Sequence, residues 1–236
     1  MDATDSPATS GAVSRAGRGQ STRGHRRRSS LLEAAADLLL EQGVSAVTHR
    51  AVATRAAVPL AATTYYFTSL QDLRDQALRH LADRWLQRSR QAVAGLPARI
   101  DSAEELARAL VKVVTGAGRS ADTPPHRLLA MYERYLEAGR HPRLRPFVVA
   151  YNDDLAALAQ EVLRRGGLPR SQQHARLALA VVDGALITAL AEGQPPPPTA
   201  VRALTTFLEG VGWADAAYQT RGLPIRRGEC DAVRPK

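Results

Sequence analysis

Two short helical patterns separated by a tight turn occupy residues 48–67, and no other stretch constrains the fold as strongly. Thr48 can cap the first helix, because its hydroxyl can accept a hydrogen bond from a free N–H of the first turn. An apolar stripe at helical spacing follows, made of Val52, Ala53 and Ala56. The pattern breaks at Ala57-Val58, and Pro59 is suited to open the second helix because it needs no N–H there.

The second helix of this stretch is small and carries no charge. Its residues are Leu60, Ala61, Ala62, Thr63, Thr64, Tyr65 and Tyr66. Two short helices, a tight turn and a polar, uncharged second helix are typical of a helix-turn-helix, whose second helix lies in the DNA major groove. A helical hairpin inside an all-α core is the alternative, because the helix-turn-helix is also a generic packing unit.

The flanks favour DNA binding. An amphipathic helix from Ser30 to Gln42 precedes the stretch and is closed by Gly43, and Ser69 can cap a longer helix behind it. Residues 26–81 resemble the tetracycline-repressor (TetR) family of one-component regulators. The resemblance is carried by Gly43, Thr48, Val52-Ala53, Ala57-Val58-Pro59, Tyr65-Tyr66-Phe67 and Asp72-Leu73.

Several positions depart from the family pattern. Ala57 and Pro59 replace the glycine and serine that usually flank the turn valine, and Ala61 replaces a glycine. Thr64 stands at a usual tyrosine position, and Leu70 stands where a lysine commonly holds a phosphate. A left-handed conformation at Ala57 would cost about 1–2 kcal/mol.

The 236 residues allow one large or two small domains, and a net charge of +9 suggests a polyanionic partner. Residues 1–29 are rich in Ser, Gly, Ala and Arg and are expected to be a disordered basic arm. The arm is either a solvated tail or a DNA contact that includes Arg26, Arg27 and Arg28. No signal peptide is expected, since no apolar run follows these charges.

Helical patterns continue through the rest of the chain, and the predicted fold is all-α. A three-helix head (30–75) would precede a larger helical domain (76–218) and a disordered tail (219–236). Within the larger domain, Ser102 and Glu105 form a capping box, residues 119–125 form a loop, and Pro195 to Pro198 form a stiff extended spacer before a helix capped by Thr199. No apolar run is long enough to span a membrane.

The resemblance implies that the larger domain binds a small molecule and that its last two long helices pair with a second subunit. Residues 178–190 are small and apolar nearly all round, as expected of a helix buried on every side. The candidate homodimer residues are Leu177, Val181, Gly184, Leu204, Phe207 and Leu208.

A candidate effector pocket lies between the middle helices, although such stripes are more often plain core. Its candidate residues are Met131, Tyr132, Tyr135, Phe147, Tyr151 and Asp154. The six histidines show no metal-ligand spacing, Cys230 is alone, and no catalytic motif stands out, so neither an enzyme nor a cofactor is expected. His49, beside Thr48, is a candidate phosphate contact.

Arg50 is the nearest side chain able to grip a guanine, while Leu60 to Tyr66 offer methyl groups, hydroxyls and rings to A·T pairs. The resulting hypothesis is a cytoplasmic dimeric regulator, more specifically a repressor, that binds a palindromic DNA operator and is released by a small-molecule effector. The rival is a helical enzyme or lipid-binding module whose head is a generic hairpin.

Overall fold

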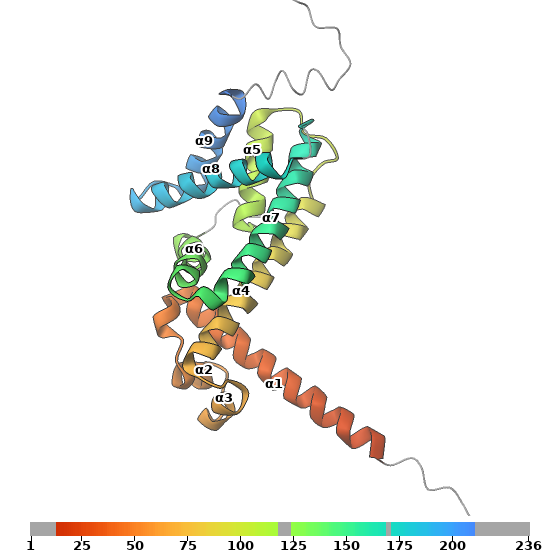
Figure 1. Ribbon diagram of the computed structural model, residues 1–236, viewed down its shortest axis with the longest axis vertical. Coiled ribbons are helices and arrows are strands. Elements are labelled where there is room, and N and C mark those ends of the chain that lie inside the picture. Colours follow the sequence, from red (N-terminus) through yellow and green to blue (C-terminus); the bar gives the residue numbers. More distant parts are fainter. Residues whose placement is uncertain (1–12, 118–123, 169–170, 211–236) are drawn as a thin grey trace, which may run out of the picture. The chain divides into compact units, whose positions relative to one another are not determined.

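The computed structural model describes residues 13–117, 124–168 and 171–210, and every regular element in them is helical (Figure 1). This confirms the predicted all-α class. The first twelve residues of the predicted arm, most of the predicted 119–125 loop and the predicted tail lie outside the described residues. The elements are α1 (Val13–Gln42), η1 (Val44–Ala46), α2 (His49–Arg55), α3 (Leu60–Tyr66), α4 (Leu70–Ala94), α5 (Ala103–Thr115), α6 (Pro125–Arg140), η2 (Pro142–Leu144), α7 (Arg145–Arg165), α8 (Gln172–Ala191) and α9 (Pro196–Gly210).

The chain divides into two compact units after Leu81, later than the boundary that we expected at residue 75, and α4 contributes to both. The first unit is the head. Its core is built from the inner faces of α1, α2 and α4, with fully buried side chains at Leu31, Leu39, Val52 and Leu73. Burying such side chains, rather than the propensity of the short helices, stabilises a head of this size.

Side chains cap the head helices where the sequence predicted. The Ala51 N–H donates to Thr48 Oγ1 over 3.1 Å at the start of α2. The Asp72 N–H donates to Ser69 Oγ over 3.0 Å at the start of α4. Each bond satisfies one of the free N–H groups of a first turn.

Helix α1 is much longer than predicted, because it begins at Val13 instead of Ser30 (Figure 1). Residues 24–29, which we expected in a disordered arm, are therefore helical. Extending an existing helix fixes one residue for each new hydrogen bond, and arginine is a good helix former. Contacts across the head add support, since Arg28 donates to Gln76 of α4 and its guanidinium lies 6.0 Å from the Phe67 ring centroid.

The second unit is a helical domain in which α8 packs along α9 and against α5 and α7, while α6 packs on α7 (Figure 1). Its core includes Leu106, Leu110, Leu163, Leu186 and Leu204, all nearly inaccessible to solvent. The predicted Ser102 cap is present, with the Glu105 N–H donating to Ser102 Oγ over 3.2 Å.

The proline run before α9 is a correction. Pro196 to Pro198 form the first turn of α9, and the Thr199 N–H donates to the Pro195 carbonyl over 3.2 Å, so Thr199 is not a cap. Proline fits a first helical turn because those N–H groups have no partner within the helix.

Helix α8 is a second correction. Within the described residues it is long and apolar enough to cross a membrane, with a mean hydropathy of 1.5, although we expected no such run. One helix of this kind is weak evidence, because a core helix passes the same test. Here the apolar character comes from a buried face that includes Val182 and Leu186 and an outer face that carries the exposed Leu177 and Ile187 besides small side chains.

Candidate DNA interface and effector pocket

The turn between α2 and α3 is closed by backbone hydrogen bonds around a left-handed alanine. Ala57 has a φ of 53°, and the Val58 N–H donates to the Ala53 carbonyl over 3.0 Å. Pro59 is the residue before α3 rather than its first residue, and its carbonyl accepts from the Ala62 N–H over 2.9 Å. These hydrogen bonds hold the two helices in the arrangement of a helix-turn-helix, and the left-handed conformation at Ala57 is the strained point of the turn.

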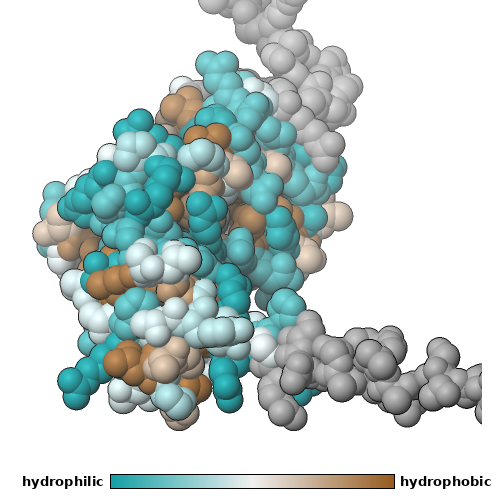
Figure 2. All heavy atoms as spheres, turned by 60° about the horizontal axis from the view of Figure 1, so that its bottom comes forward, coloured by the Kyte–Doolittle hydropathy of each residue, from teal (hydrophilic) through white to brown (hydrophobic). Residues whose placement is uncertain are grey.

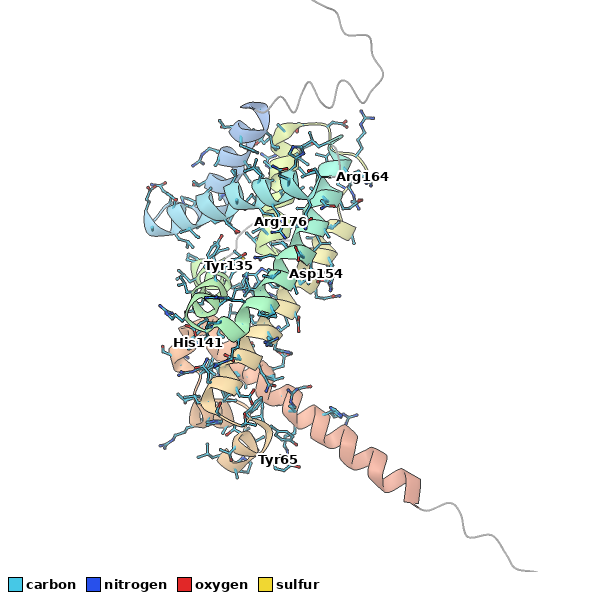
Figure 3. All side chains as sticks on the ribbon, in the orientation of Figure 1. Tyr65, Tyr135, His141, Asp154, Arg164 and Arg176 are labelled. Carbon is cyan, nitrogen blue, oxygen red and sulfur yellow. The ribbon has the colours of Figure 1, made fainter. Side chains whose placement is uncertain are left out.

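The outer face of α3 presents Tyr65, which is 81% exposed and is labelled in Figure 3. Its ring meets Tyr66 edge-on, with centroids 4.9 Å apart. Leu60 is half exposed, Ala61 is exposed, and Ala62 is half-buried. The face that Figure 2 brings forward is mixed, with brown apolar areas among pale and teal residues. Such a surface suits thymine methyl groups and single hydrogen bonds.

The two threonines of α3 differ. Thr63 is fully buried and its hydroxyl donates to the Leu60 carbonyl over 2.8 Å, so this predicted DNA contact is part of the core instead. Thr64 is exposed, and its hydroxyl donates to the Ala61 carbonyl over 3.1 Å, which leaves its lone pairs for an outside donor. The sequence pattern did not distinguish neighbours on opposite faces of so short a helix.

On α2, Arg50 and Arg55 have different roles. Arg50 is exposed and forms no hydrogen bond or ion pair with any described residue. Arg55 binds Glu41 through both guanidinium nitrogens, at 3.1 and 2.8 Å, and so fixes α2 against α1. His49 is half-buried, and its Nδ1 is buried without a partner. Arg50 is therefore exposed and uncommitted among the described residues, so it can bind another molecule.

A chain of polar contacts joins α1 to the start of α4. Arg28 donates to Gln76, Gln76 Nε2 donates to Asp72 Oδ1 over 2.7 Å, and the Thr68 N–H donates to Asp72 Oδ2 over 2.9 Å. Burial alone would raise the pKa of Asp72, but these hydrogen bonds and the Arg28 charge hold that pKa below its ordinary value. Arg28 is thus engaged within the head, while Arg26 and Arg27 are exposed.

A pocket of about 650 Å³ lies between α6 and α8. It is almost wholly apolar, a composition typical of small-molecule sites. Its lining consists of Pro125, Leu129, Tyr132, Tyr135, Leu136, Asp183, Ile187, Leu190 and Ala191. Leu129, Leu136 and Ile187 are large apolar side chains that remain about half exposed there.

Asp183 is the one carboxyl group in this lining. The Tyr132 hydroxyl donates to Asp183 Oδ1 over 3.0 Å, and the Tyr132 and Tyr135 rings stack with centroids 6.4 Å apart. Burial raises the pKa of Asp183, and the Tyr132 hydrogen bond and the Arg134 charge oppose that rise. Burial and the Asp183 charge raise the pKa of Tyr132, so this hydroxyl remains a donor.

Arg134 is buried beside the pocket, and its guanidinium carbon lies 4.5 Å from the Tyr135 ring centroid and 4.2 Å from that of Tyr151. It donates to the Met131 carbonyl and, over 3.3 Å, to the Tyr135 hydroxyl. Tyr135 in turn donates to Asn152 Oδ1 over 2.8 Å. Arg134 Nε and the Tyr151 hydroxyl are buried without partners among the described residues.

Only two of the six predicted ligand residues, Tyr132 and Tyr135, line this pocket. Met131 and Tyr151 are buried and Phe147 is half-buried, and none of them belongs to the lining. Asp154 is exposed and lies 3.1 Å from Arg90 in an ion pair (Figure 3). Asp183 was missed, although an isolated acid within the apolar 178–190 segment was a signal available in the sequence.

The predicted dimer residues separate into two groups. Leu177 and Gly184 are exposed on α8, with Val181 half-buried between them, and nothing lies within 4 Å of a Cβ placed on Gly184. Leu204 and Leu208 are buried in the core of their own subunit, which removes them from the candidate interface, and Phe207 is half-buried. The available surface is therefore a face of α8.

Two family models match the chain. The model of bacterial regulatory proteins of the tetR family matches residues 31–77, and that of the tetracyclin repressor-like C-terminal domain matches residues 101–211. The multidrug binding protein EbrR, in a crystal structure with proflavin, is 31% identical over 76% of this chain and 98% of its own, with a TM-score of 0.57. The chain belongs to the TetR family. The helix-turn-helix interpretation is therefore confirmed over the generic hairpin.

Other TetR structures agree with this assignment. EbrR complexed with ethidium is 30% identical over 76% of this chain and 97% of its own, with a TM-score of 0.55. A TetR family member from Streptomyces coelicolor A3 is 28% identical over 76% and 96%, with a TM-score of 0.52. A comparison with curated proteins gives no match. The chain is a TetR-family transcriptional regulator with a DNA-binding head and a ligand-binding C-terminal domain.

Proposed function

We propose that this regulator is a cytoplasmic homodimeric repressor that binds a palindromic operator through α2 and α3 and leaves it when an aromatic cation fills the pocket between α6 and α8. The observation that carries the effector class is Asp183, a carboxyl group set in an apolar, tyrosine-lined pocket of about 650 Å³. A flat cation would meet aromatic faces and an opposite charge in the same space.

The relatives support this chemistry. EbrR has been crystallised with proflavin, with ethidium and with malachite green, as the titles of those structures state. These are flat or propeller-shaped aromatic dyes that carry positive charge. Release from DNA follows if the ligand binds the DNA-incompetent form of the dimer more tightly than the competent one, in proportion to that difference in affinity.

Ethidium is a suitable probe, because its charge does not change with pH. Wild-type protein should bind it, and Asp183→Asn should weaken binding by about tenfold or more, the size of one lost charge interaction in a partly buried site. Asp153→Asn is the matched control, since Asp153 is an exposed acid of α7 that pairs with Arg176. Equal affinities in all three proteins would remove Asp183 as the counter-ion.

For DNA binding, the proposal assigns Arg50 to a guanine in each half-site. Thr64 and Tyr65 would contact neighbouring A·T pairs. Thr48, His49 and Tyr66 would contact phosphates. Arg50 supports this because it is exposed and uncommitted within the described residues. Arginine forms paired hydrogen bonds with guanine, whereas lysine offers only a point charge.

Arg50→Ala and Arg50→Lys separate base reading from phosphate binding. Both should relax the preference at one G·C pair per half-site when bound sequences are selected from a random pool, and Arg50→Ala should cost about 1–3 kcal/mol. If Arg50→Lys keeps both the affinity and the wild-type motif, Arg50 is a phosphate contact. A gel shift with and without ethidium then tests release on the same DNA.

Dimerisation is proposed through the outer face of α8, because a single helix-turn-helix reads too few base pairs to be selective. The exposed Leu177 and Gly184 and the half-buried Val181 support this face. The open space at Gly184 permits close approach of a second helix, and Leu177 offers it an exposed apolar side chain.

A further inference from the structure

We infer that Arg134 is a built-in cation that tunes the pocket: its buried guanidinium, packed against the pocket residue Tyr135, attracts the Asp183 carboxylate and repels the positive charge of a ligand, which limits the pocket to weakly charged, delocalised cations. The inference rests on the proposed function, because it concerns the same pocket between α6 and α8. It assigns the pocket's selectivity to a residue that does not line it.

Arg134 carries a charge that nothing neutralises in contact. Its side chain is only 5% exposed, and it forms no ion pair with any carboxylate among the described residues. Two tyrosine faces, the Met131 carbonyl and the Tyr135 hydroxyl surround the guanidinium, and its Nε lacks a partner. Burying an unpaired charge is costly. Because water screens such a charge poorly, its field acts strongly on ionisable groups and ligands close to it.

The Asp183 carboxyl is where that field matters. From α6, Tyr132 donates a hydrogen bond to it and Arg134 acts on it through charge. The charges of Arg134 and Asp183 also act on Tyr135 of α6 and Tyr151 of α7. The hydroxyls of both tyrosines remain neutral, because burial raises their pKa. Helices α5 and α9 also pack against α8, but none of their described side chains forms a hydrogen bond or ion pair with Asp183.

Two consequences follow from one charge. Burial disfavours the ionised form of Asp183 and Arg134 favours it, so removing Arg134 should raise the pKa of this carboxyl. A bound cation would lie near Arg134 as well as Asp183, so removing Arg134 should also strengthen cation binding once Asp183 is ionised. Removing Arg134 should therefore weaken cation binding at low pH, where Asp183 becomes protonated, and strengthen it at high pH. A purely structural arginine would produce neither.

The test compares full-length wild type with Arg134→Met, which removes the charge, and Arg134→Lys, which keeps it. Carboxyl titration by NMR, with the Asp183 signal assigned from Asp183→Asn, needs no ligand. We expect Arg134→Met to move the Asp183 midpoint upward and Arg134→Lys to leave it near that of wild type. Unchanged midpoints in both variants would overturn the inference.

Ethidium affinity across pH supplies the second measurement. Well above the Asp183 midpoint, Arg134→Met should bind ethidium more tightly by about tenfold, as expected for one removed like-charge interaction at intermediate dielectric. Its affinity should then fall more steeply than that of wild type as the pH drops. A parallel profile, or weaker binding at every pH, would mean that Arg134 serves only to pack the aromatic side chains.

If Arg134→Met does not fold, a measurement on wild-type protein replaces it. Calorimetry at pH 7.5 in two buffers of different ionisation enthalpy counts the protons released when ethidium binds. If Arg134 holds Asp183 in its charged form at this pH, ethidium binding releases no proton, and release of one proton for each ethidium would overturn the inference. Absence of ethidium binding would refute the proposed ligand alone, since the ligand-free titration still tests Arg134.

Discussion

Ala57→Gly should stabilise the DNA-binding head, because Ala57 holds a backbone conformation that glycine adopts without strain. Its φ of 53° is left-handed, which costs an L-residue about 1–2 kcal/mol. Ala57 is exposed, so no packing is lost when its methyl group is removed. Glycine also increases the conformational entropy of the unfolded chain, which lowers stability by about 0.4–1 kcal/mol. The difference leaves a net gain of about 0.5–1 kcal/mol.

The neighbouring residue supplies the control. Ala56 has a right-handed φ of −80°, where glycine offers no relief, so Ala56→Gly should destabilise the head by about 0.5–1 kcal/mol. The two variants have the same composition, but Ala56 is half-buried, so part of its loss comes from packing. The gain in stability in Ala57→Gly is therefore what reports the conformation at Ala57, and Ala56→Gly shows that glycine alone does not produce it.

Native-state amide exchange measured by NMR reports the local free energy directly. The Val58 N–H, which donates to the Ala53 carbonyl across the turn, should exchange about two- to fivefold more slowly in Ala57→Gly. It should exchange faster in Ala56→Gly. If both variants accelerate exchange by the same factor, the left-handed turn is not strained and this account of the head is wrong.

Three further predictions concern the larger unit. Gly116→Ala should lower the thermal midpoint sharply, because φ is +57° and a new Cβ would lie 2.8 Å from the Trp85 ring; calorimetry measures this. Gly184→Arg should give monomers with a folded head and no operator binding, and an intact dimer in light scattering would refute the α8 interface. Burial raises the pKa of Asp183 in the native state, so its ionisation lowers stability as pH rises from the ordinary aspartate pKa through the native one. Asp183→Asn should therefore raise the thermal midpoint at pH 7.5 and lose that advantage below the ordinary aspartate pKa.

The features of the head that were readable from the sequence depend on neighbouring residues. Thr48 and Ser69 cap helices that begin at the next residue, and the break at Ala57-Val58 marks the turn. Such signals need only a few residues, so pattern reasoning identifies them. The helical state of Arg28 was harder to predict, because its partner Gln76 is 48 positions away in the chain.

The pocket was harder to predict, because helical spacing identifies the apolar face of a helix but not which other helix packs against that face. Tyr132 and Tyr151 satisfy the same pattern, yet only Tyr132 lines the cavity, whereas Tyr151 is buried with the Arg134 guanidinium against its ring. Arginine is normally exposed, so no pattern in the sequence placed Arg134 in the interior.

Asp183 carried the stronger signal, and its physical basis is general. A carboxyl group in an apolar helix lowers stability relative to alanine, because its charge loses solvation on burial. Tyr132 and Arg134 offset part of that loss but not all of it, because the pKa of Asp183 remains raised. The fold therefore bears the cost of a carboxyl group that faces an otherwise apolar pocket, as the proposed counter-ion for a bound cation would. The isolated acid of this apolar helix was thus a better guide to the lining of the pocket than the predicted aromatic residues, of which only Tyr132 and Tyr135 line it.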